Sequence, residues 1–141
     1  TGVQLEVGSQ ATAFEHRSFT EELTLCSRYF HAFNTRTDAN NIIGLGYYYS
    51  DTEVRVPVRS YTEMRAVPTV ETTNSTDHFK IYALSGAILF PTFNSSHQQH
   101  KGGLVLGATI ADNNGGGQSG YVVSNYDAST GLGVVSLNAE L

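Results

Sequence analysis

Alternation of apolar and polar residues is the dominant pattern along the chain. In TEVRVPV, residues 52–58, every second residue is Val, and Pro57 falls on the polar side. A period of two is typical of a strand with one buried face, and a proline, which has no N–H, belongs on the exposed side or at an edge. Comparable stretches are RYFHAF (28–33), NIIGLGYYYS (41–50), TVETT (69–73), HFKIYAL (78–84), AILFPTF (87–93), GLVLGATI (103–110), YVVSNY (121–126) and LGVVSLNAEL (132–141). The pattern predicts an all-β fold, an antiparallel β-sandwich of about eight or nine strands.

The first 27 residues follow a different pattern. VQLEV, residues 3–7, alternates and then stops at Gly8, which predicts a short strand that closes an upstream module. In SFTEELTLC, residues 18–26, Ser18 and Glu21 have the spacing of a capping box, and Phe19 and Leu23 with Leu25 or Cys26 give one apolar face. This segment predicts a helix of about two turns, too short to be stable alone and therefore expected to dock as a linker. We expect residues 1–27 to be an upstream end and linker, and 28–141 to be one β-sandwich domain.

The polar segments between the predicted strands, called separators below, contain most of the candidate functional residues. Two of them, NSSHQQHKGG (94–103) and ADNNGGGQSG (111–120), are longer than a hairpin requires and predict long loops. His97 and His100 in the first are weak evidence for a metal site, because no Cys or carboxylate accompanies them, and they are better explained as polar loop residues. The second lacks the alternating ligands of a calcium loop. No nucleophile elbow or comparable motif surrounds any Ser, His, Asp or Cys. The sequence therefore predicts no enzyme, no cofactor and no metal.

Composition and charge argue against some classes of partner. The net charge is −5, and only eight Lys and Arg residues are scattered along the chain, which argues against nucleic acid. The single cysteine, Cys26, cannot form an intrachain disulfide, and no apolar run has the length of a membrane span, so no membrane insertion is expected. Tyr48 points to the opposite face from Tyr47 and Tyr49, so part of this cluster is expected at the surface or at a subunit contact.

Three segments in order carry a resemblance to a known family. VQLEVGSQATAFEHRSFTEELTLCSRYF, followed by MRAVPTV (64–70) and a chain end in NAEL, resembles the C-terminal, distal-tip region of bacteriophage tail fibre and tailspike receptor-binding proteins. The matching segments cover residues 3–30, 62–70 and 137–141. In that family the QLEVGS strand closes an upstream carbohydrate-binding-like jelly roll, and a terminal β-sandwich follows at the tip of a homotrimeric fibre. For this chain we expect that sandwich to be jelly-roll-like. The resemblance also implies that Met64 to Val70 are framework that leads into a strand.

The resemblance implies a role in host adsorption. The expected function is reversible binding of a bacterial surface glycan or outer-membrane receptor, with fibre trimerisation, in a phage tail virion assembled in the bacterial host cytoplasm. Two alternatives stay open: a purely structural trimerisation cap, and a non-catalytic module of a glycan depolymerase. The apolar stretch with Ile42, Ile43 and Leu45 exceeds what one small sandwich needs, which favours burial between subunits.

The two long separators are the predicted receptor site. Their amide, hydroxyl and charged groups suit hydrogen bonding to sugar hydroxyls, and the alternative is that both are solvated connections. Tyr121 is the candidate apolar platform in place of the missing Trp, and the alternative for it is a buried Tyr at the start of a strand. The predicted ligand-binding residues are Ser96, His97, Gln98, Gln99, His100, Lys101, Asp112, Asn113, Asn114, Gln118 and Tyr121.

Overall fold

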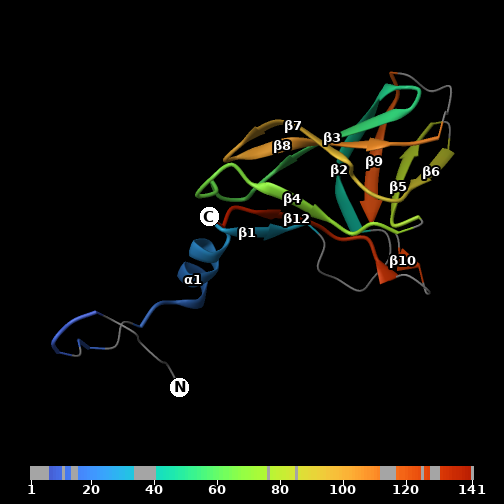
Figure 1. Cartoon of the computed structure of the whole chain (residues 1–141). Coiled ribbons are helices and arrows are strands. Elements are labelled where there is room, and N and C mark those ends of the chain that lie inside the picture. Colours follow the sequence, from blue (N-terminus) through green and yellow to red (C-terminus); the bar gives the residue numbers. More distant parts are fainter. Residues whose placement is uncertain are drawn as a thin grey trace.

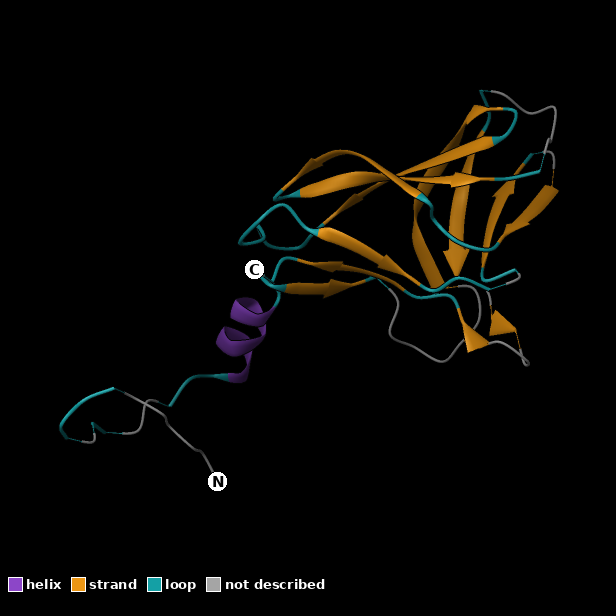
Figure 2. Ribbon diagram, in the orientation of Figure 1, coloured by secondary structure: helices purple, strands orange, loops and turns teal. Residues whose placement is uncertain are grey.

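The chain folds into two antiparallel sheets that face each other, with a short helix at one end (Figures 1 and 2). The structure is a computed structural model. It describes residues 7–10, 12–13, 16–33, 41–75, 77–84, 86–111, 117–124, 126–127 and 131–140. Within these residues there are one helix and twelve strands, which confirms the all-β sandwich.

The larger sheet has seven strands. From edge to edge they are β6 (Gly86–Phe90), β5 (Phe79–Ala83), β9 (Ser119–Ser124), β2 (Asn41–Ser50), β3 (Glu53–Arg59), β8 (Gly103–Thr109) and β7 (Ser95–His100). The smaller sheet has the order β1 (Phe30–Ala32), β12 (Val135–Asn138), β4 (Thr69–Thr72), and β10 (Tyr126–Asp127) pairs separately with β11 (Gly131–Leu132). A jelly roll divides eight strands between its two sheets. The division into seven and three strands does not confirm that finer expectation.

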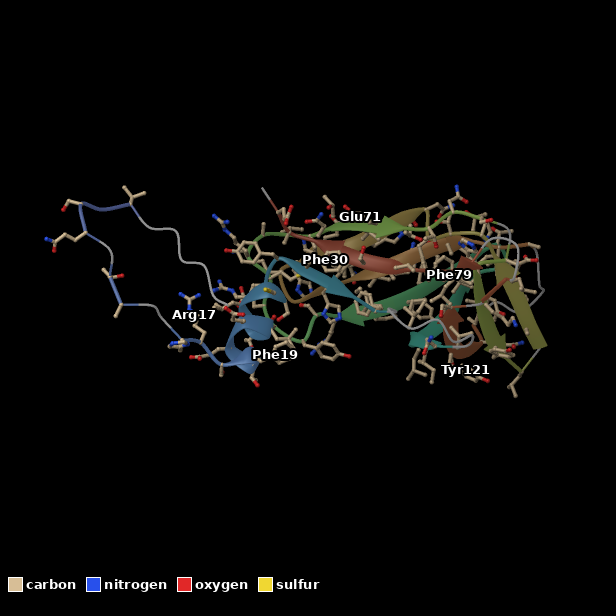
Figure 3. The ribbon with its side chains drawn as sticks, turned by 90° about the horizontal axis from the view of Figure 1, so that it is seen from below. Arg17, Phe19, Phe30, Glu71, Phe79 and Tyr121 are labelled. Atoms are coloured by element: carbon tan, nitrogen blue, oxygen red, sulfur yellow. The ribbon has the colours of Figure 1, made fainter. Side chains whose placement is uncertain are left out.

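The core lies between the two sheets. Val54, Val56 and Val58 of β3 are almost fully buried, as their alternation predicts, and they pair with Ala108, Leu106 and Leu104 of β8. Val135 and Leu137 of β12 close the same cluster from the smaller sheet. Phe79 lies inside the sandwich, where its ring centroid is 4.9 Å from that of Phe93 and 5.7 Å from that of Phe90 (Figure 3).

Strands β2 and β3 confirm two details of the sequence pattern. Tyr48 is buried, whereas Tyr47 and Tyr49 are exposed on the opposite face. Pro57 is exposed, although its strand lies inside the sheet rather than at an edge. The pairing of β2 with β3 ends at Tyr47 and Arg55, two residues before the proline, so no N–H is required of Pro57 on that side.

The segment between β3 and β4 is framework at its C-terminal half. Met64 is buried, and its backbone N–H donates to the carbonyl oxygen of Lys101 at 2.8 Å. The N–H of Arg65 donates to the carbonyl oxygen of Arg28, also at 2.8 Å. Pro68 then leads into β4, which begins at Thr69 as the sequence predicts. These bonds connect the segment to the turn between β7 and β8 and to the turn before β1, and they explain why it is ordered without being a strand.

Helix α1 (Phe19–Cys26) begins where the sequence predicts, but it does not pack against the domain as expected. Ser18 is the N-cap, and its hydroxyl oxygen accepts the N–H of Glu21 at 3.2 Å, which completes the capping box with the Glu21 carboxylate. No residue of the helix is buried. The expected strand at residues 3–7 lies outside the described residues except for Val7, which is exposed and not in a strand.

Two expectations about particular residues are wrong. Residues 95–100 were expected in a long loop, and the structure places them in β7, an edge strand paired with β8. An edge strand needs no apolar alternation when little of it is buried, so its polar sequence resembles a loop. Ile43 was expected at a subunit contact together with Ile42 and Leu45, but it is buried in the core of the single chain. Ile42 and Leu45 are exposed.

Candidate binding site around Tyr61

The predicted residues of the first separator are spread along β7 and its hairpin. His97 faces away from the core, and its Nε2 lies 3.6 Å from the Glu53 carboxylate. The amide of Gln99 donates to the hydroxyl of Ser96, and Gln98 has a φ of 49° at a register shift between His97 and His100. This bulge interrupts the outer edge of the sheet and limits strand addition there.

The predicted residues of the second separator lie elsewhere. Asp112, Asn113 and Asn114 are outside the described residues. The carbonyl oxygen of Gln118 accepts the N–H of Tyr48 at 2.9 Å. Tyr121 lies on the outer face of β9, where its ring stacks on that of Tyr82 at 5.0 Å between centroids (Figure 3). Because β2, β3 and β8 separate β9 from β7, the structure does not bring Tyr121 together with the residues of β7.

His100 and Lys101 meet a segment that the sequence analysis did not select. A depression of about 540 Å³ lies at the tip of the β7–β8 hairpin and is lined by Ser60, Tyr61, Thr62, Glu63, His100, Lys101 and Gly102. The N–H of Ser60 donates to the carbonyl oxygen of Gly102 at 3.2 Å, and the Ser60 hydroxyl donates to that of Lys101 at 3.4 Å. Backbone bonds therefore fix the loop that carries Tyr61 against the hairpin.

The chemistry of this depression suits a neutral, hydroxyl-rich ligand. Tyr61 is 90% exposed; its ring contacts the His31 ring on one side, and the rest of the ring forms a flat apolar platform at the surface. Around it, Glu63 supplies carboxylate acceptors, Lys101 supplies an ammonium donor, and the Ser60 hydroxyl can both donate and accept. His100 is already oriented, since its Nδ1 accepts the N–H of Gly102 at 3.1 Å. Apolar sugar faces and sugar hydroxyls match this combination.

A second depression lies on the other side of Tyr61 and is mostly apolar. It has a volume of about 460 Å³ and is lined by Leu23, Thr24, Ser27, Phe30, His31, Ala32, Tyr61 and Thr62. His31 is buried between Phe33 and Tyr61, with ring centroids 4.8 and 4.7 Å away. The Nε2 atom of His31 is buried and has no hydrogen-bond partner among the described residues. This second depression is therefore a groove that extends from α1 to the Tyr61 ring.

Burial lowers the pKa of His31 below its ordinary value of 6.5. Below about pH 6.5 the unfolded chain takes up a proton at this imidazole while the folded chain resists it. The contribution of neutral His31 to stability is therefore complete above that pH and is lost as the pH falls.

We expect His31→Phe to flatten this pH dependence, because Phe fits the same aromatic surroundings and does not titrate. Urea unfolding at about pH 7.5 and about pH 5.5 should show a smaller loss of stability for the variant than for the parent. Equal losses in the two proteins would place the acid sensitivity at other groups.

The outer face of the seven-stranded sheet is a separate aromatic surface. The Arg55 guanidinium lies over the Tyr49 ring, 3.4 Å from its centroid, and donates to Glu53 at 2.8 Å. This hydrogen bond raises the pKa of Arg55. Tyr49 is thus engaged within the chain, whereas Leu45 is largely exposed. The face offers exposed apolar area, which favours a protein contact.

Sequence reasoning missed Tyr61, Ser60 and Glu63. The available signal was an aromatic residue in a short polar connection between two strands, since a Tyr that is not needed for alternation has no reason from the pattern to be buried.

The described residues contain no group of three or more His, Cys, Asp or Glu that could hold a metal ion. In the same residues, no helix is long and apolar enough to cross a membrane.

Comparisons with protein-family models, with curated proteins and with solved structures found no match for this chain.

Proposed function

We propose that this chain is the distal domain of a bacteriophage tail fibre or tailspike and that it binds a glycan on the bacterial surface without cleaving it. The single observation that supports glycan binding is the exposed Tyr61 ring beside the polar depression of Ser60, Glu63 and Lys101. The proposal of a phage origin rests on the sequence resemblance. Both agree with a β-sandwich whose ligand site is built from the connections at one end.

The proposal includes a homotrimer. A depression this open gives modest affinity, and three linked copies raise the effective concentration without new contacts. The exposed apolar residues on the outer sheet face, among them Ile42 and Leu45, favour a further role in subunit contact. This observation also supports the second candidate, a structural cap that trimerises the fibre and leaves recognition to other modules.

The test is a bacterial glycan array probed with the purified chain, together with light scattering. Glycan recognition predicts binding to a defined group of surface polysaccharides and a trimeric mass at micromolar concentration. A trimer that binds no glycan and does not adsorb to cells would favour the structural cap. Depolymerised polysaccharide after incubation would contradict a purely binding role.

A further inference from the structure

Helix α1 is specified by the sequence, but the described part of its own chain leaves all of its residues unburied. Both bonds of its capping box are present, yet none of its eight residues is buried. The Phe19 side chain is 80% exposed and that of Leu23 is 56% exposed. Isolated helices of this length are marginal in water, and most helix stability in proteins comes from packing of an apolar face. The helix therefore requires a partner.

The spacing of its apolar residues points to another helix. Phe19, Leu23 and Cys26 are four and three residues apart, which is the alternating spacing of a coiled-coil seam. Residues at this spacing lie on one face of a helix. Such a stripe packs best against an identical stripe, because knobs and holes then match in register.

The apolar surface continues from the helix onto the sandwich. The groove beside Leu23 is lined by Phe30, which is 50% exposed, and by Tyr61. Phe19 on α1 and Phe30 at the start of β1 lie at the same end of the molecule (Figure 3). A neighbouring helix on the seam would also cover the Leu23 and Phe30 end of this groove and would leave the polar depression on the other side of Tyr61 open.

We propose that the α1 seam, formed by Phe19, Leu23 and Cys26, is a subunit interface at which the helices of three copies pack together. The inference rests on the homotrimer of the proposed function and adds where the copies meet. A sugar does not cover a stripe of this kind, because its hydroxyls would lose water without gaining partners. The contact would also bring together the three segments that enter α1, as a fibre requires.

The only cysteine of the chain provides the test. Cys26 is exposed in the single chain and falls in the seam, so a short bismaleimide should join two subunits through it. Denaturing gels of the intact protein should show a cross-linked dimer as the main product, because each chain has one thiol. A matched control, Leu25→Cys with Cys26→Ser, moves the thiol out of the seam by about 100° around the helix. It should give at least a several-fold lower yield.

A second variant tests the same contact without cross-linking. Leu23→Glu places three carboxylates in the seam and should weaken trimerisation at least about 10-fold by light scattering across a dilution series. Leu84→Glu, at an apolar residue that is also highly exposed but lies outside the seam, should leave the trimer intact.

The outcomes separate this inference from the proposed function. A trimer that tolerates Leu23→Glu and shows no cross-linking through Cys26 would overturn the seam and place the interface on the sheet face. A monomer with Cys26 protected from alkylation would show that the chain's own preceding segment covers α1. A monomer with reactive Cys26 would overturn both the seam and the homotrimer.

Discussion

Tyr61→Ala is expected to weaken glycan binding by about 30-fold, or ~2 kcal/mol, because the ligand loses its platform. The change also uncovers one side of the buried His31 ring, so a loss of stability of about 1 kcal/mol is expected beside it. Tyr61→Phe keeps the ring and should retain most of the affinity. Isothermal titration with the polysaccharide selected on the array measures the difference.

Tyr121→Ala is the matched control for this prediction. Tyr121 is a second exposed tyrosine, on the outer face of β9, and the sequence pattern selected it as the platform. If the binding loss follows Tyr121 instead of Tyr61, the ligand lies on the sheet face and the depression beside Tyr61 is not the site. Equal losses in both variants would indicate a ligand long enough to reach both surfaces.

Gly120→Ala is expected to destabilise the fold by about 3 kcal/mol or more. A Cβ atom at this position would overlap the carbonyl oxygen of Tyr82 on the neighbouring strand β5. Backbone atoms cannot rotate away as a side chain can, so the pairing of β5 with β9 must open. Urea unfolding measures the loss.

Gly8→Ala serves as the comparison for that substitution. A Cβ at Gly8 meets only the carbonyl oxygen of Gln10 at 3.6 Å, an ordinary contact, and the residue is exposed. Its unfolding free energy should stay within about 0.5 kcal/mol of the parent. A Gly120→Ala protein as stable as the parent would mean that β5 and β9 are not paired as described.

The strands were predictable because burial leaves a period of two in the sequence. The alternation of Val54, Val56 and Val58 predicted one buried face of a strand, and all three side chains are buried in the core. Strand β7 was missed because it pairs with β8 at the edge of the sheet through backbone hydrogen bonds. Backbone hydrogen bonds do not require apolar side chains, so the sequence of β7 shows no apolar alternation. The helix start was predictable for a local reason, since Ser18 and Glu21 satisfy each other's backbone groups within one turn.

The candidate site was not predictable from local patterns. Tyr61 and Lys101 are far apart in the sequence, and they meet because β3 pairs with β8 so that Arg59 lies opposite Gly103. That register depends on the packing of the whole sheet. The polar character of His100 and Lys101 and the position of Tyr61 in a polar connection were visible in the sequence, but their proximity was not, because only the fold brings them together.

Hydrogen exchange with and without the selected polysaccharide tests the central claim most directly. Binding beside Tyr61 predicts slower exchange at residues 60–64 and 100–102, where backbone N–H groups bridge the loop and the hairpin. The outer sheet face around Tyr121 should exchange as it does in the free protein. Unchanged exchange at residues 60–64 and 100–102 under saturating polysaccharide would contradict the account.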